Sequence, residues 1–401
     1  MTEWKECTIA DIGTVVGGAT PSTKQEDNYD GGTIAWITPK DLSGFQGRYI
    51  SYGERNITEK GLRSCSTQML PKHSILFSSR APIGYVAIAE NELCTNQGFK
   101  SVVPNENTDY LFLYYLLKYN KDAIENMGSG TTFKEVSGNT MKGIRVRVPV
   151  ELAVQKRIAS ILGSIDDKIE ENNRINNNLL EQIVSLYCKL ADEATQTVKI
   201  GDIAEKVAMG PFGSNIKVST FVDEGVPIIS GNHLRGFYLE ELEFNYITED
   251  HAERLKNSNV YANDIIFTHA GNIGQVAMIP KGSKYDRYVL SQRQFYLRCK
   301  TDLVVPEYVL FFFHSSEGQY ELLSYANQTG VPSIAQPASN LKKIPIPLPS
   351  LEAQLAWKDT VEPLIELYLQ NRKESERLAN ARDGLLPKLM TGDLDVSEIE
   401  I

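Results

Sequence analysis

The sequence lacks the patterns that mark secretion, membrane insertion and metal binding. No apolar run approaches the ~18 residues that a membrane span needs, and the first ten residues, MTEWKECTIA, do not form a signal peptide. The five cysteines are scattered and include no CxxC pair, which predicts reduced thiols in the cytoplasm and excludes a disulfide or zinc framework. The five histidines have no HExxH or HxH spacing, so we expect no metal site.

Sequence patterns of catalysis are missing too. There is no GxxxxGK[ST] phosphate loop, no GxGxxG after a strand and no [DNS]PP[YFW] stretch of the kind that amino-methyltransferases use. Gly128-Ser129-Gly130 resembles half a phosphate loop, but no lysine follows at the needed spacing. Asp166 and Asp167 are adjacent and do not share a helix face, so we expect solvated charges there and not a catalytic pair.

The net charge of −10 gives no support for nucleic-acid binding, but the excess acid is unevenly distributed. Segments 1–150 and 196–350 carry net charges of 0 and −2, whereas the much shorter segments 151–195 and 351–401 carry −3 and −5. A nearly neutral domain can still present one basic face, so charge alone leaves the function open.

What the sequence does contain is an internal repeat with an offset of about 190 to 200 residues. Four segments recur in the same order, and the chain is therefore two copies of one unit. The matched segments are Ile9–Ile12 with Ile200–Ile203, His73–Ile88 with Asn263–Met278, Tyr110–Tyr115 with Tyr308–Phe313, and Met141–Pro149 with Leu341–Pro349.

Each copy is predicted to be rich in β-structure, with short β-favouring stretches between Gly, Pro and Asn turns. One helix per copy is expected, near Tyr110–Asn126 and Glu307–Tyr325, and its apolar stripe is expected to pack in a core. The predicted strands are Thr33–Thr38, Ile75–Ser79, Tyr85–Ala89 and Ile144–Val148, then Val226–Ser230, Ile265–Thr268, Gln275–Ile279 and Gln294–Arg298.

A long helix is predicted after each copy. In the first, apolar positions from Ile158 to Leu190 keep a 4-3-4-3 spacing, which is the seam of a coiled coil. The corresponding seam from Trp357 to Leu389 is weaker, and Pro363 and Gly384 are expected to kink or fray it. Both seams become polar at the same two steps, and such residues fix the register of a pair. These register positions are Asn172 and Asn176 in the first helix and Asn371 and Ser375 in the second.

The connectivity predicts that the two helices pair antiparallel. The second copy enters at the C-terminus of the first helix and exits into the N-terminus of the second, and the termini of a domain of this size are often close. Asn172 would then face Ser375, and Asn176 would face Asn371. The alternative is two solvated helices that never meet. The expected α+β fold therefore has β-rich domains at 1–150 and 196–350, followed by long helices at 151–195 and 351–401, the last including the C-terminal tail.

Polar turns rich in hydrogen-bonding side chains are the candidates for binding, and DNA is the ligand that they suit. Arginine favours guanine and Asn or Gln favours adenine, whereas Lys and Ser usually hold phosphates. For each residue alone the alternative is a solvated loop. The candidates in the first copy are Thr20, Lys24, Thr38, Lys40, Ser79, Arg80, Thr131, Thr132 and Lys134. Those in the second are Ser214, Lys217, Asn232, His233, Arg235, His269, Asn272, Gln292, Arg293 and Gln294.

The order of domain, helix, domain and helix resembles the specificity subunit of Type I restriction-modification enzymes over essentially the whole chain. The first exit segment, Ile144–Gln155, departs from the pattern because it lacks a second proline. The segments that carry the resemblance are Gly18–Lys24 (GATPSTK), Ile34–Leu42 (IAWITPKDL), Ile75–Ala87 (ILFSSRAPIGYVA), Ile344–Gln354 (IPIPLPSLEAQ) and Ala381–Leu394 (ARDGLLPKLMTGDL).

The resemblance implies two target recognition domains that read a bipartite, asymmetric site in double-stranded DNA, separated by helices that form an antiparallel coiled coil. It implies no catalysis and no cofactor in this chain. The partners would be two modification subunits, which use S-adenosylmethionine to methylate adenine, and possible restriction subunits that translocate and cut DNA. Two alternatives remain at this point: a bivalent protein scaffold without a role on DNA, and a chain that is itself a methyltransferase or nuclease.

Overall fold

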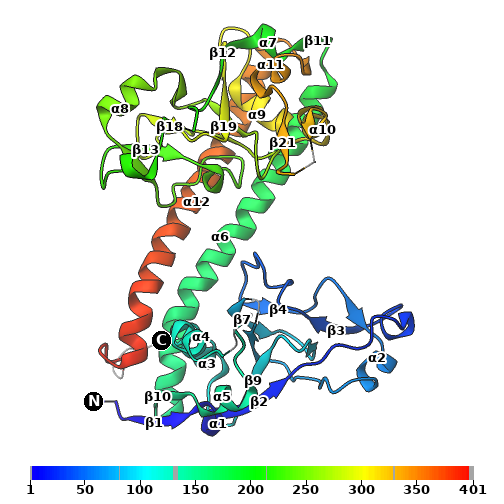
Figure 1. Ribbon diagram of the computed structural model, residues 1–401, viewed down its shortest axis with the longest axis vertical. Coiled ribbons are helices and arrows are strands. Elements are labelled where there is room, and N and C mark those ends of the chain that lie inside the picture. The colour runs from blue at the N-terminus through cyan, green and yellow to red at the C-terminus, as the bar shows by residue number, and fades with distance from the viewer. Residues whose placement is uncertain (1, 81, 130–133, 214, 328–329, 397–401) are drawn as a thin grey trace. The chain divides into compact units, whose positions relative to one another are not determined.

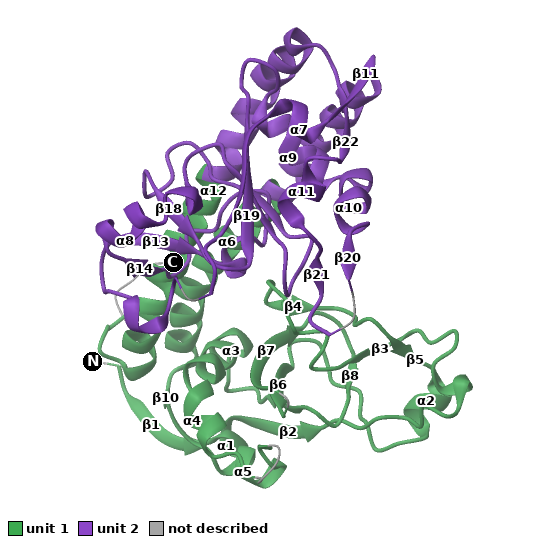
Figure 2. Ribbon diagram, turned by 45° about the horizontal axis from the view of Figure 1, so that its top comes forward, with its two compact units in different colours: residues 1–175, 370–401 green, residues 176–369 purple. Residues whose placement is uncertain are grey.

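The computed structural model describes residues 2–80, 82–129, 134–213, 215–327 and 330–396. The chain divides into two compact units, shown in different colours in Figure 2. Unit 1 comprises residues 1–175 and 370–401, and unit 2 comprises residues 176–369. Each unit therefore holds one copy of the repeat together with about half of each of the two long helices.

Unit 1 is built on a five-stranded sheet in which β6 and β7 form an antiparallel hairpin beside β9. The unit also contains a smaller three-stranded sheet and a two-stranded ribbon. The large sheet has the order β2 (Gly13–Gly17), β9 (Lys100–Pro104), β6 (Ile75–Ser79), β7 (Ile83–Ala89) and β4 (Tyr49–Ile50). The small sheet has the order β5 (Asn56–Ile57), β3 (Ile34–Ile37) and β8 (Cys94–Thr95). The ribbon pairs β1 (Trp4–Thr8) with β10 (Arg145–Pro149).

Unit 2 repeats this arrangement (Figure 1). Its main sheet has the order β12 (Ala204–Met209), β19 (Gln294–Cys299), β16 (Ile265–Thr268) and β17 (Val276–Met278). The second sheet has the order β14 (Asn245–Ile247), β13 (Val226–Ile229), β18 (Tyr288–Leu290) and β15 (Asn259–Val260). The two-stranded pairs are β11 (Gln196–Lys199) with β22 (Pro345–Leu348), and β20 (Ala326–Asn327) with β21 (Ser333–Ile334).

The short helices follow the same repeat. Helices α1 (Ile9–Ile12), α2 (Glu59–Arg63), α3 (Tyr110–Tyr119), α4 (Lys121–Asn126) and α5 (Gly138–Gly143) correspond in order to α7 (Ile200–Ile203), α8 (Glu249–Arg254), α9 (Pro306–His314), α10 (Ser316–Leu323) and α11 (Pro337–Leu341). Even a strained position recurs, because His73 and Asn263 both have a φ of 70° just before the equivalent strands. The predicted internal repeat is confirmed.

The prediction of one helix per copy is wrong in detail, because each is broken in two. In unit 1 Asn120 ends α3 and begins α4. In unit 2 Ser315 has an extended backbone, and its hydroxyl accepts a hydrogen bond from the Gly318 amide at 3.1 Å, which starts α10. The core assignment is confirmed, since the residues of α3 from Phe112 to Leu117 are buried.

The two long helices, α6 (Leu152–Asp192) and α12 (Leu351–Thr391), pair antiparallel inside each unit. In unit 1 Asp166 of α6 contacts Arg382 of α12, and Asn172 contacts Ser375, so the numbers rise along one helix and fall along the other. The predicted seam is buried at Ile158, Leu162, Leu179, Ile183 and Leu190 of α6. The alternative of two separate solvated helices is wrong.

Where their contacts are described, the polar residues of the first seam contact the second helix as predicted. The Nδ2 atom of Asn172 donates to Ser375 Oγ at 3.3 Å and to Glu374 Oε2 at 2.8 Å. In unit 2, Asn176 Nδ2 donates to the Tyr368 carbonyl at 3.3 Å. The pairing of Asn176 with Asn371 stays a prediction. Neither Pro363 nor Gly384 ends α12, which is one helix through both positions, and the expected kink stays a prediction.

A buried glutamine fixes the start of each long helix in the same way. In unit 1 the Gln155 side chain accepts from the Asp109 amide at 3.0 Å and donates to the Pro149 carbonyl at 3.1 Å. In unit 2 Gln354 accepts from the Val305 amide at 3.0 Å and donates to the Pro349 carbonyl at 2.9 Å. Each glutamine thereby ties the exit strand of its domain to the first turn of the helix and to the short helix below it.

Candidate DNA-recognition surface

In unit 2 the candidate side chains gather at one edge of the main sheet. Because β16 and β19 are antiparallel, with Thr268 opposite Gln294, the loop after β16 and the turn before β19 meet there. The loop after β13 reaches the same edge, since the Ser291 amide donates to the Ile229 carbonyl at 2.8 Å. The loop after β12 joins it through Gln292, whose Nε2 donates to the Ile216 carbonyl at 3.5 Å. Four loops from separate parts of the sequence therefore form one polar surface.

Two of the candidates in unit 2 hold this surface together and are closed to a ligand. Gln294 is 1% exposed, and its side-chain oxygen accepts from the Ser291 hydroxyl. His233 is 4% exposed, with Nδ1 accepting from the Ser230 amide at 2.9 Å and the ring stacked on Phe244. Burial lowers the pKa of His233, so the ring is held neutral. The expectation that these two side chains contact DNA is corrected to a structural role.

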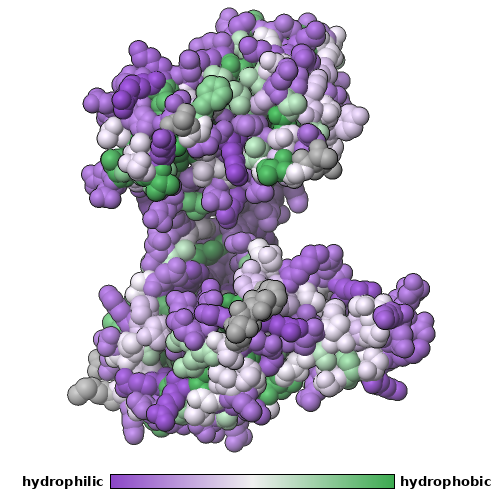
Figure 3. Space-filling view, in the orientation of Figure 1, coloured by the Kyte–Doolittle hydropathy of each residue, from purple (hydrophilic) through white to green (hydrophobic). Residues whose placement is uncertain are grey.

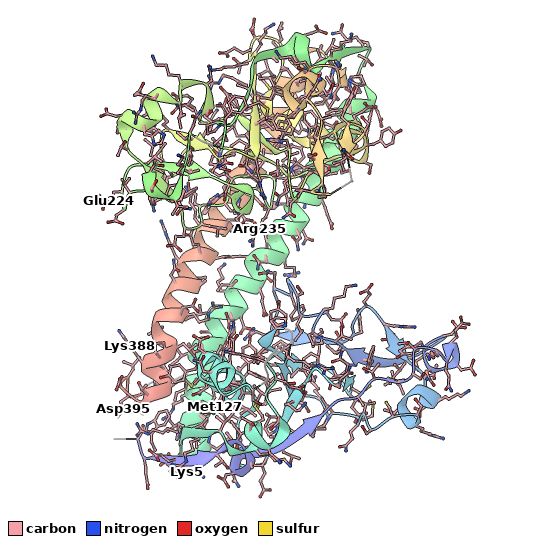
Figure 4. The ribbon with its side chains drawn as sticks, viewed as in Figure 1. Lys5, Met127, Glu224, Arg235, Lys388 and Asp395 are labelled. Atoms are coloured by element: carbon pink, nitrogen blue, oxygen red, sulfur yellow. The ribbon has the colours of Figure 1, made fainter. Side chains whose placement is uncertain are left out.

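The other described candidates in unit 2 remain open to a ligand. Lys217, Asn232, Arg235, Asn272, Gln292 and Arg293 are exposed. His269 is half-buried and Nε2 lies 3.1 Å from the Gln292 carbonyl, which orients its ring beside Arg293. Arg235, which Figure 4 labels, lies in the loop after β13 but next to Gly236, on which a Cβ would lie 3.7 Å from the Tyr368 hydroxyl of α12, so it lies beside the long helix. Ser214 lies outside the described residues.

The equivalent edge of unit 1 collects its own candidates. Thr20 donates a hydrogen bond to Gln97, and Arg80 lies 3.8 Å from Glu135, which also faces Lys100 at 3.4 Å. Lys24 and Lys134 are exposed. Thr131 and Thr132 lie outside the described residues.

Three further candidates in unit 1 have structural partners. Ser79 is fully buried and donates to the Gly98 carbonyl at 3.1 Å, so its assignment as a DNA contact is corrected. The Thr38 hydroxyl donates to Asp41 Oδ2 at 2.6 Å, which shapes the turn after β3. Lys40 pairs with Glu54 at 2.6 Å between two exposed side chains, and such a pair opens at little cost.

Asn96 and Gln97 are two further candidates that were not predicted from the sequence. They occupy the turn before β9 that matches Gln292 and Arg293 before β19, because β9 and β19 pair with equivalent strands. The signal was present as TNQGF beside SQRQF. The two turns share few residues and the strands before them differ in length, so sequence similarity alone does not align them.

A buried ionic cluster joins the first domain to the long helices within unit 1. Asp166 is 4% exposed, and its carboxylate accepts from the Tyr115 hydroxyl and from Arg382 Nη1, both at 2.6 Å. Buried Arg48 pairs with Glu170 at 2.9 Å and with the outer carboxylate of Asp167. The expectation of two solvated aspartates is therefore wrong for Asp166. The adjacent side chains point apart, and the helix face at Asp166 is covered by the domain.

Neither a metal cluster nor a membrane span is found in the part of the chain that the structure describes. No group of three or more His, Cys, Asp or Glu side chains there has the geometry to hold a metal ion. No described helix is long and apolar enough to cross a membrane. On the face drawn in Figure 3, apolar residues lie scattered among hydrophilic ones.

Comparisons with known proteins agree with this organisation. The family model of the Type I restriction modification DNA specificity domain matches residues 1–181 and 193–378, one match for each copy of the repeat. The chain therefore belongs to this family, as a non-catalytic subunit that recognises DNA for a Type I restriction-modification system.

Particular relatives cover the whole chain or one part of it. The MjaIX specificity subunit of Methanocaldococcus jannaschii is 32% identical over 99% of this chain and 95% of its own length. The EcoR124I/EcoR124II specificity subunit of Escherichia coli is 31% identical over 41% of each chain. The crystal structure of the S subunit from M. genitalium matches 99% of this chain and 97% of its own with a TM-score of 0.58, at 16% identity, and supports the fold.

Proposed function

We propose that each domain reads one half of a split, asymmetric DNA sequence through the loops at the edge of its main sheet. The observation that carries this proposal is that both copies bring the same loops to the same edge but place different side chains there. Arg80 at the end of β6 corresponds to Ala270 after β16, and Asn96-Gln97 correspond to Gln292-Arg293. A shared scaffold with different hydrogen-bonding groups is suited to reading two different base sequences.

The paired long helices set the gap between the two half-sites in this proposal. Each domain packs on its own half of the helix pair, through the cluster at Asp166 in unit 1 and through aromatic rings in unit 2. Tyr187 of α6 and Trp357 of α12 both contact Tyr308 there, with ring centroids 5.2 and 6.3 Å apart. A joint made of buried groups resists bending, which a spacer of fixed length requires.

The chemistry is supplied by other subunits. Two modification subunits that use S-adenosylmethionine to methylate adenine would bind this chain, and restriction subunits would join the assembly. The partner subunits would also provide much of the phosphate contact, which fits the net charge of −10 on this chain.

A binding titration tests the proposal. The chain is titrated, with and without its co-expressed modification subunit, against a pool of random duplex DNA, and the bound fraction is sequenced. We expect enrichment of a two-part motif with a fixed gap. Absence of sequence-selective binding under both conditions contradicts the proposal and favours a protein scaffold, and methyl transfer by the isolated chain would indicate an enzyme.

A further inference from the structure

Phe212 has an unusual position beside the recognition edge of unit 2. It is 86% exposed, although a phenylalanine normally buries its ring. Its loop follows β12 directly and belongs to the surface that Lys217 and Gln292 share. An exposed aromatic ring next to hydrogen-bonding side chains is what proteins use to stack on nucleic-acid bases.

Close contacts on both sides of Phe212 restrain the backbone of its loop. A Cβ on Gly210 would lie 2.0 Å from the Ser291 carbonyl oxygen, so only glycine allows the loop to press against the turn before β19. Pro211 is buried and restricts the backbone, and the Asn215 amide donates to the Phe212 carbonyl at 2.8 Å. The backbone that carries the ring is thus restrained before any ligand binds, which lowers the entropic cost of binding.

An open hollow of about 1070 Å³ beside Phe212 is basic. Lys206, Arg254 and Lys256 line it together with Glu253. Glu253 pairs with Arg287, which also pairs with Glu249, and the three lining cations have no carboxylate partner within 4 Å among the residues placed in the structure. Cations without a carboxylate partner beside an exposed ring are complementary to a phosphodiester backbone next to its bases.

We propose that Phe212 stacks on a base of the half-site read by the second domain, while Lys206, Arg254 and Lys256 hold the neighbouring phosphates. This inference rests on the proposed function and adds a distortion of the DNA to it. The matching position of the first domain, two residues after Gly18 as Phe212 is after Gly210, is Thr20. A contact to a subunit that engages both repeats would be expected in both, whereas a contact to one half-site need not recur.

The test uses the complex of the full chain with its modification subunit and duplexes that carry 2-aminopurine at successive positions of the second half-site. We expect the wild-type complex to change the fluorescence at one position and F212A to abolish that change, with affinity lowered about tenfold to a hundredfold. F212W should retain both. Y320A removes another exposed ring of unit 2, on α10, and should behave as wild type.

The outcomes separate this inference from the function on which it rests. If F212A keeps wild-type affinity and fluorescence while the wild-type complex still selects its target, the stacking is wrong and the function stands. If F212A instead weakens co-purification with the modification subunit, Phe212 is a protein contact, and the inference is overturned. If the wild-type complex selects no sequence, both fail.

Discussion

At the scale of single residues, the two domains differ most clearly at Arg80. Its guanidinium is partly exposed and lies 3.8 Å from Glu135, a distance that leaves it free to turn toward DNA. Arg80→Ala should relax discrimination in the half-site read by the first domain by about tenfold to a hundredfold, because a bidentate contact to a base contributes ~1–3 kcal/mol. The other half-site should be unchanged. Binding to duplexes with single-base changes in each half measures this.

Arg63→Ala is the matched control for Arg80. Arg63 is exposed and pairs at 3.7 Å with Glu59 one turn earlier on α2, so its loss should alter neither half-site. Equal loss of selectivity in both half-sites on Arg80→Ala would show that Arg80 is structural.

A second residue-scale prediction concerns pH. Burial lowers the pKa of His314 to about 4, and its Nε2 donates to the Val276 carbonyl at 2.9 Å. The unfolded chain has a histidine pKa of ~6.5, so the unfolded state takes up a proton first as pH falls. The stability from the neutral ring is present above pH 6.5 and is lost as the pH falls toward 4, by up to roughly 3 kcal/mol.

Urea unfolding of the wild-type chain and of His314→Gln between pH 7.5 and 4.5 measures this loss. The wild type should lose more stability over this range than the variant. Parallel profiles would indicate that His314 is protonated equally easily in the folded and unfolded chain.

At the scale of elements, two neighbouring aspartates in the ionic cluster on α6 should differ in how much they stabilise the protein. Asp166→Ala removes one carboxylate partner of half-buried Arg382, which keeps Asp383, and the acceptor of the Tyr115 hydroxyl, which should lower the free energy of unfolding by about 1.5–3 kcal/mol. Asp167→Ala, one residue on, removes an outer carboxylate that is 72% exposed and should cost about 1 kcal/mol or less. Chemical unfolding of the two variants and of the wild type measures the two losses of stability. Equal costs would mean that the cluster does not fix the domain on the helix.

The sequence predicted the secondary-structure elements and their order better than it predicted individual contacts. The repeat, the seams and strands such as Ile75–Ser79 follow from periodicity and were confirmed. Each predicted helix is divided in two, after Tyr119 and after His314, by a single capping residue. The apolar stripe continues across the division, so the sequence pattern did not predict it. The burial of Ser79, His233 and Gln294 depends on which loops pack together in the folded chain, and no local sequence pattern predicts that packing. Asp166 was misassigned for the same reason, since its partners lie 51 and 216 residues away.

At the scale of the whole molecule, the helix pair should determine the gap between half-sites. One heptad inserted after Asn176 in α6, with a matching heptad before Asn371 in α12, preserves the seam and adds about 10 Å at ~1.5 Å per residue. The gap should lengthen by one to about three base pairs, at ~3.4 Å each, with both half-sites unchanged. The motif selected by the variant complex measures this. A heptad in α6 alone is the control, and it should impair assembly because the seams no longer match.

The most direct test of the account is the methylated sequence itself. Adenine methylation is mapped across the genome of cells that express this chain with its modification subunit, and compared with cells that express the modification subunit alone. We predict one asymmetric motif in two parts with a gap of fixed length, present only when this chain is present. A continuous or palindromic motif, or methylation that does not depend on this chain, would contradict the claim that two different domains each read one half of the target.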